Sequence, residues 1–293
     1  MPKFAVAARA VAVAALLATA SGCVGPGYFS DGTSVSVGAF NRGALRRGAR
    51  LPARGEGWVI PQLWQTRGNN FATDELVAAV EHAARRVRRE YPGAILGVGD
   101  MSQRGGGSNV LHRSHENGRD LDLIYYAVDD KGKPVLPADS MPRYPFFDLR
   151  ARDPLPPEHG VVFGPFSTRF FDVKRNWALV RALLEEPGIE IQYLFIHARL
   201  RERLLAYAAE QGEDPALLER AEAILHQPGD SAPHDDHLHV RIFCAESDRA
   251  LGCRDVGPVR WWKKRYKYMP PTVPRVDVDE LAGALAQLIG VVR

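Results

Sequence analysis

Two short stretches of the chain concentrate side chains that bind metals or move protons. The first, PHDDHLHV at residues 233–240, holds His234, His237 and His239 within six positions. The apolar residues of HLHVRIFC alternate with polar ones, which predicts a strand. His237 and His239 then point to one face while the apolar residues face a core. Two imidazoles would project together from a rigid element, as a metal site requires.

The second stretch, HRSHENGRDLDLI, follows a glycine-rich loop and runs into a predicted strand; it contains His112, His115, Asp120 and Asp122. Six residues separate His115 from Asp122, and a turn from loop to strand of that length can return both side chains to one point. An imidazole and a carboxylate together suit zinc, and a catalytic zinc site usually has three protein ligands and a position for water. Asp120 shares the strand face with Asp122, and its carboxylate can hydrogen-bond to a residue that binds the metal.

The remaining histidines carry weaker signals. A lone histidine is more often a surface residue or a hydrogen-bonded core residue than a ligand. His82 falls on the exposed side of an arginine-rich helix, and we interpret it in this way, together with His197 and His226.

Composition excludes one class of function. The chain has 293 residues, 45% of them hydrophobic and 25% charged, which is typical of a globular protein. The formal net charge is only +3, and Lys3 and Arg9 in the first 22 residues supply two of these charges. No nucleic-acid partner is therefore indicated.

The first 22 residues resemble an export signal, with a basic start, a short apolar run and the small residues Ala20-Ser21-Gly22 before Cys23. The small residues before cysteine resemble a bacterial lipoprotein signal, in which Cys23 becomes the lipidated first residue; the alternative is an ordinary cleaved signal. The two other cysteines, Cys244 and Cys253, flank eight residues. In an oxidising compartment we expect them to form a disulfide, with two free buried thiols as the alternative.

Helices and strands mix without a regular alternation, so we expect an α+β fold rather than a doubly wound sheet. Residues 24–60 read as an irregular lead-in. Thr73 is a predicted N-cap. Predicted helices cover residues 74–91, 175–186, 198–212 and 215–229, and predicted strands cover residues 94–100, 118–128, 189–197 and 237–244.

The C-terminal part has a different composition. RWWKKRYKY, residues 260–268, mixes bases with aromatic residues; it either stacks on glycan or binds anionic groups, or it is a strand with a solvated basic face. Residues 269–293 read as a proline-rich linker followed by an amphipathic helix. This helix either docks on its own domain or contacts a partner or membrane.

Together, HRSHENGRDLDLI and HDDHLHVRIFC resemble the penicillin-insensitive murein endopeptidases. These belong to a metallopeptidase group that includes lysostaphin-type enzymes, D-alanyl-D-alanine carboxypeptidases and the hedgehog fold. The similarity spans roughly residues 34–253. It implies a domain over residues 24–268 in which a small antiparallel sheet carries a zinc site and is flanked by helices.

By position, the resemblance assigns the zinc ligands to His115, Asp122 and His239, and the acid–base roles to His237 and His234. His112, with Asp120 and, in a looser alignment, His159, falls on residues that support the ligands or a second metal.

The resemblance also implies the reaction. A metal-activated water would hydrolyse the D-alanyl-meso-diaminopimelate crosslinks of peptidoglycan in the periplasm, insensitive to β-lactams. A lipid anchor would hold the protein at the outer membrane. Two alternatives remain: a D,D-carboxypeptidase or dipeptidase of the same metal group, and a non-catalytic, zinc-stabilised lipoprotein that binds the cell wall.

Overall fold

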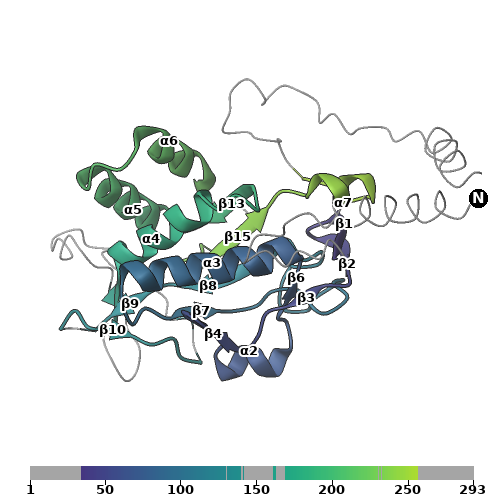
Figure 1. Cartoon of the computed structure of the whole chain (residues 1–293), viewed down its shortest axis with the longest axis horizontal. Coiled ribbons are helices and arrows are strands. Elements are labelled where there is room, and N and C mark those ends of the chain that lie inside the picture. Colours follow the sequence, from purple (N-terminus) through teal and green to yellow (C-terminus); the bar gives the residue numbers. More distant parts are fainter. Residues whose placement is uncertain are drawn as a thin grey trace, which may run out of the picture.

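A computed structural model describes residues 34–129, 131–139, 141, 161–162, 169–229, 231 and 233–256 (Figure 1). Several predictions fall outside these residues: the signal over residues 1–22, Cys23, His159, and the segments 260–268 and 269–293. Among the described helices, none has the length and apolarity needed to cross a bilayer.

A seven-stranded sheet forms the centre of the fold. In spatial order its strands are β14 (Leu225–His226), β13 (Ile191–Phe195), β15 (His237–Ile242), β8 (Asp120–Ile124), β7 (Leu96–Val98), β5 (Trp58–Val59) and β4 (Arg54–Gly55). The four strands from β13 to β7 pair antiparallel, while β13 with β14 and β5 with β7 pair parallel. The α+β prediction is confirmed, although the sheet extends beyond its antiparallel centre.

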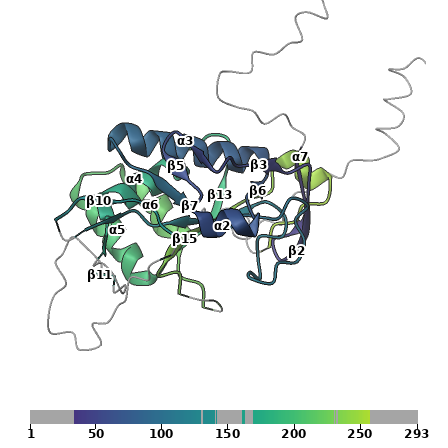
Figure 2. The ribbon, with the colours of Figure 1, turned by 90° about the horizontal axis from the view of Figure 1, so that it is seen from below.

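The four longest helices share one buried core with this sheet. The longest are α3 (Asp74–Glu90), α4 (Val173–Leu184), α5 (Ala198–Glu210) and α6 (Pro215–Ile224), and two short helices are α2 (Gln62–Arg67) and α7 (Glu246–Ala250). Figure 2 shows α3 along one side of the sheet. Leu121 and Leu123 of β8 and Val240 of β15 join the apolar residues of α3 and α4 in one buried core. Since side chains alternate across a strand, the polar residues between them face the other side.

Thr73 is the N-cap residue of α3, as predicted, but its side chain makes no capping hydrogen bond. The hydroxyl of Ser34 instead accepts the N–H of Asp74 at 2.9 Å, across forty residues of sequence. The start of this helix is therefore capped by a non-local segment.

Residues 34–60 are more regular than predicted. The hairpin of β1 (Val35–Ala39) and β2 (Arg42–Arg46) forms there, and β3 (Ala49–Arg50) pairs with β6 (Phe71–Ala72). The sequence of the hairpin shows no clear alternation, and the contacts that anchor it are made by the backbone: the Gly38 N–H donates to the Gly252 carbonyl, and the Gly38 carbonyl accepts the N–H of Arg254.

A further sheet contains β9 (Ala127–Val128), β10 (Pro134–Val135), β11 (Val161–Val162) and β12 (Arg169–Phe171).

Cys244 and Cys253 form the predicted disulfide. The bond closes a loop that contains α7 and that carries the anchor of the β1–β2 hairpin. Beyond the loop, Asp255 accepts a 2.8 Å hydrogen bond from the buried Arg119, next to the start of β8. The disulfide loop therefore joins the hairpin and the central sheet.

Replacing both cysteines by alanine should lower the free energy of unfolding by about 3 kcal/mol, since the crosslink restricts the unfolded chain over a loop of this length. Urea unfolding of the oxidised wild type and the double variant measures the difference. Dithiothreitol should destabilise the wild type to the same extent and leave the variant unchanged. Equal unfolding midpoints for both oxidised proteins would contradict this prediction.

Candidate metal centre

The pairing of β8 with β15 brings the two predicted clusters together. His239 lies opposite Asp122 in this antiparallel register. The Nδ1 atom of His239 is 2.9 Å from Asp122 Oδ1, and the Nε2 atom of His237 is 3.4 Å from the same oxygen. Two residues more than a hundred positions apart therefore meet because backbone hydrogen bonds set the register.

The loop before β8 supplies the other imidazoles. His115 is 1% exposed, and its Nε2 atom lies 3.4 Å from Asp122 Oδ1. His112 Nδ1 lies 3.9 Å from Asp122 Oδ2. His115 has a φ of +68°, in the left-handed region that non-glycine residues rarely adopt. Such strain persists only where the surroundings enforce it, and it clusters at functional sites.

Glycine allows this loop to lie close against β2. At Gly106, which has a φ of +65°, a Cβ atom would come within 2.1 Å of the Glu116 carbonyl and 2.5 Å of the Leu45 nitrogen. The N–H of Glu116 in turn donates to the Phe40 carbonyl at 3.0 Å. These backbone contacts fix the segment that carries His115.

Asp122 is the centre of the cluster. Burial raises the pKa of its carboxyl group, but the neighbouring His237 and His115 lower it further, so the pKa lies well below its ordinary value. Oδ1 makes no hydrogen bond, although three imidazole nitrogens lie within 3.4 Å of it. Neither ring nitrogen of His115 makes a hydrogen bond either. A cation among these atoms would satisfy buried groups that are costly to leave unpaired.

Three of the histidines each have a second carboxylate behind the ring. His239 Nε2 is 2.8 Å from Asp120, His237 Nδ1 is 2.6 Å from Asp236, and His112 Nε2 is 3.0 Å from Asp100. In each of these three histidines, the other ring nitrogen faces Asp122. A carboxylate behind a histidine fixes its tautomer and orientation for metal binding. Asp120 lies where its expected supporting role requires it, and that role stays a prediction.

Asp100 and Asp236 were not singled out from the sequence. Asp100 directly follows the strand-like run AILGVG, and Asp236 directly precedes His237. A carboxylate at a strand end, or beside a candidate histidine, is the signal that would have found them. Asp100 also accepts hydrogen bonds from Arg67 at 2.5 Å and from Asn69 at 3.0 Å.

His234 completes the cluster from the segment before β15. Its φ is +56°, and its backbone carbonyl accepts hydrogen bonds from the Tyr125 hydroxyl at 3.0 Å and the His197 N–H at 3.1 Å. Burial, with the neighbouring His237 and His239, lowers the pKa of its ring to about 3. Its ring centroid lies 5.0 Å from that of His237.

These groups form two neighbouring sets of metal-type ligands. His234, His237 and His239 form one, and His112, His115 and Asp122 form the other, with the ligand atoms of each set within 4.8 Å of one another. The predicted trio of His115, Asp122 and His239 bridges the two sets through Asp122. Imidazole nitrogens with one carboxylate fit a transition-metal ion of the zinc type.

The other described histidines belong to neither ligand set. His82 contacts Glu186 at 3.3 Å, His197 is the N-cap residue of α5, and His226 packs 6.1 Å from the Tyr193 ring. These contacts agree with the structural interpretation of all three residues.

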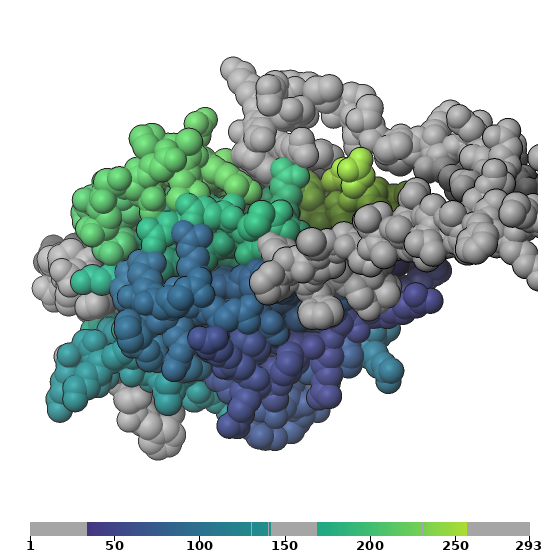
Figure 3. Space-filling model, in the orientation of Figure 1, coloured from purple at the N-terminus to yellow at the C-terminus, as the bar shows by residue number. Residues whose placement is uncertain are grey.

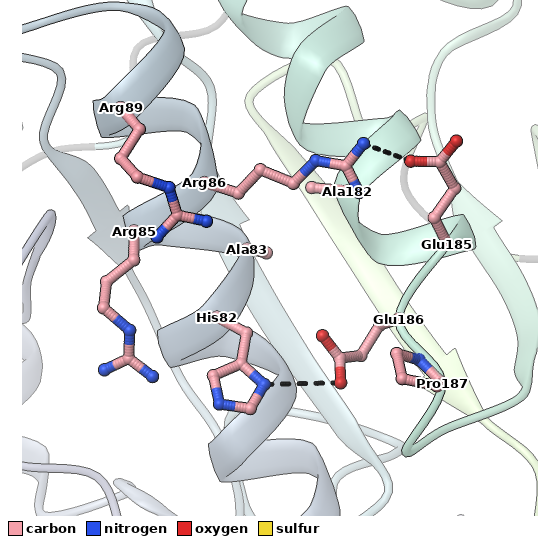
Figure 4. A pocket seen from close by; sticks show the side chains of 9 residues that line it. All are labelled: His82, Ala83, Arg85, Arg86, Arg89, Ala182, Glu185, Glu186 and Pro187. Atoms are coloured by element: carbon pink, nitrogen blue, oxygen red, sulfur yellow. Dashed lines mark hydrogen bonds and ion pairs between the residues drawn. The ribbon is translucent and has the colours of Figure 1, made fainter. Parts of the chain in front are cut away.

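A surface hollow of about 280 Å³ lies between α3 and α4 (Figure 4). The residues of α3 and α4 lie next to each other on the face of the molecule drawn in Figure 3. Arg86 pairs with Glu185, and His82 pairs with Glu186. The charges of the hollow are therefore largely compensated, and it does not compete with the metal-type cluster as a candidate active site.

Fold and site together define an α+β protein with a buried histidine–aspartate cluster of the metal-binding kind. Residues 36–149 match the family described as penicillin-insensitive murein endopeptidase. A penicillin-insensitive murein endopeptidase of Klebsiella pneumoniae is 24% identical over 228 residues, covering 78% of this chain and 72% of its own length. Another, of Escherichia coli, is 24% identical over 252 residues, covering 84% and 81%. The resemblance predicted from the two histidine motifs is confirmed: the chain is similar to these proteins over most of its length.

Asp100→Ala should destabilise the fold by about 2 kcal/mol, because the substitution leaves three neighbouring side chains without their buried acceptor. Urea unfolding measures the loss. Glu219→Ala, which removes an exposed carboxylate on α6, should change the free energy of unfolding by less than about 0.5 kcal/mol. Similar losses in the two variants would contradict the role given to Asp100.

Proposed function

We propose that this protein is a zinc-dependent peptidoglycan endopeptidase that hydrolyses D-alanyl-meso-diaminopimelate crosslinks. The observation that carries the proposal is the convergence of three imidazoles on the Oδ1 atom of Asp122. The murein endopeptidases of Klebsiella pneumoniae and Escherichia coli, to which the chain is similar over most of its length, support the substrate class.

His115, Asp122 and His239 are the proposed zinc ligands. If bound by these residues, zinc would supply a water with a pKa lowered toward ~7 and would polarise the scissile carbonyl. His239 would bind through Nδ1, since its Nε2 faces Asp120. His112 contacts Asp100 and lies beside Asp122, and it is proposed to support the ligands or to bind a second metal.

His234 and His237 are the proposed acid–base pair. Hydrolysis of an amide requires one group that takes a proton from water and one that gives a proton to the leaving amine. An unperturbed imidazole titrates near neutral pH. Burial lowers the pKa of the His234 ring, so this ring is neutral and can accept a proton. At His237 burial is outweighed by Asp122 and Asp236, which raise the pKa of the ring and favour its protonated, donating form. The two rings adjoin each other and the proposed ligand His239. Asp236 holds the His237 ring with its Nε2 atom toward Asp122.

Insensitivity to β-lactams follows from this chemistry. A β-lactam traps a nucleophilic serine as an acyl-enzyme, and the chain contains neither a G-x-S-x-G nor an S-x-x-K pattern. Activation of water leaves no acyl-enzyme to trap. We further propose export to the periplasm, with Cys23 as the lipidated residue at the outer membrane, on the basis of the N-terminal pattern.

Purified protein should convert dimeric crosslinked muropeptides to monomers with zinc, and lose this activity with a chelator or in His115→Ala. Mass spectrometry of the products identifies the bond that is cut. His82→Ala is the matched control, because it removes a histidine on the far side of the sheet, and its activity should equal that of the wild type.

Other products would identify the alternative functions. Loss of only terminal D-alanine would replace the endopeptidase by a D,D-carboxypeptidase. An intact dimer in the presence of stoichiometrically bound zinc would contradict hydrolysis and favour a wall-binding protein.

His234→Ala and His237→Ala should each lower kcat by about 10²- to 10⁴-fold, the usual contribution of one acid or base. Both variants should keep one zinc per chain by atomic absorption, because neither residue is a proposed ligand. His226→Ala serves as a control within the same strand layer. A loss of zinc equal to that of His115→Ala would move the affected residue from proton transfer to metal binding.

A further inference from the structure

The guanidinium of Arg241 lies between two aromatic rings beside the metal-type cluster. Its Cζ atom is 3.4 Å from the ring centroid of Phe40 and 5.3 Å from that of Phe195. Arg241 is 6% exposed, so this cation has little contact with water. A flat cation against aromatic faces is stabilised by the ring quadrupoles, and more strongly when water is excluded.

Arg241 holds the carboxylate behind His239. Its Nε atom donates to Asp120 Oδ1 at 2.6 Å, and His239 Nε2 lies 2.8 Å from the same oxygen. Asp120 Oδ2 is buried and makes no hydrogen bond. Contacts at Oδ1 alone therefore fix the carboxylate, and Arg241 is one of the two. His239 then presents Nδ1, 2.9 Å from Asp122.

Phe40 lies in the turn between β1 and β2, far from Arg241 in sequence. The turn is fixed from two sides. The Phe40 carbonyl accepts the N–H of Glu116, and the Glu116 carboxylate accepts the N–H of Gly43 at 3.2 Å. Close to the turn, the N–H of Gly38 donates to the Gly252 carbonyl within the disulfide loop. The aromatic ring is thus held against Arg241 by segments on both sides of the cluster.

We propose that Phe40 and Arg241 are positioning residues for metal binding. Phe40 fixes the guanidinium of Arg241, Arg241 fixes Asp120, and Asp120 holds the His239 ring with Nδ1 toward the metal position. The proposal rests on the metal ligands of the proposed function. It requires both the planar donor fork of arginine and an aromatic ring at position 40.

Zinc affinity of the full chain, measured by competition with a chromophoric chelator, tests the proposal without any peptidase assay. Phe40→Leu keeps an apolar side chain but removes the ring, and should weaken zinc binding about fivefold. Phe40→Tyr should bind zinc as the wild type does. Arg241→Gln and Arg241→Lys should each weaken binding by about 10- to 100-fold, as when a histidine ligand loses its support.

Tyr91→Leu is the matched control. Tyr91 stacks under Arg175 with a Cζ-to-centroid distance of 5.3 Å, at the end of α3 and away from the cluster. Its replacement likewise removes an aromatic ring from beside an arginine and should leave zinc affinity unchanged. Urea unfolding of the metal-free variants checks that each is folded at the temperature of the titration.

Unchanged zinc affinity in Phe40→Leu and both Arg241 variants would overturn the proposal. Reduced cleavage at unchanged zinc affinity would also overturn it, because the residues would then act on substrate. Equal losses in Phe40→Tyr and Phe40→Leu would show that packing shape, not the ring, is what matters. Zinc binding by the wild type without cleavage of crosslinked muropeptides would overturn the proposed function alone.

Discussion

The antiparallel pairing of β8 with β15 is the constraint on which the candidate site depends. Each strand buries its apolar residues toward α3 and α4, so its polar residues must share the opposite face. The register places His239 opposite Asp122 and Arg241 opposite Asp120. A shift by one residue would turn the whole polar set into the core. The hydrophobic core and the polar cluster are therefore specified by the same hydrogen-bonded ladder.

Burial of charge explains the composition of the cluster. Asp120 and Asp122 are almost completely buried, and an isolated carboxylate is costly in such surroundings. Arg241 and His239 lower the pKa of Asp120 against the effect of burial, as the surrounding histidines do for Asp122. The imidazoles thus have two functions, since they stabilise buried carboxylates and provide nitrogen atoms for a cation. The carboxylates behind the rings complete the arrangement.

Much of this site was predictable because its signals are local in sequence. The spacing of His115 and Asp122, and the alternation around His237 and His239, identified the central residues. Asp100 was missed because a strand-end carboxylate acquires meaning only when another segment places His112 beside it. Phe40 lies in a segment without clear periodicity, and its contact with Arg241 spans two hundred residues. The helices and central strands were predictable from periodicity, whereas the β1–β2 hairpin depends on non-local backbone contacts.

The order of segments along the chain has a consequence for folding. β8 is followed by more than a hundred residues before β15, its neighbour in the sheet, begins at His237. Contacts between such distant segments form late, because closing a long loop costs entropy before any contact is gained. During synthesis, all residues up to the end of β8 are made long before those of β15. The part of the cluster that β15 and the segment before it supply is therefore absent until synthesis has passed β15, and in a partial chain Asp120 lacks both His239 and Arg241.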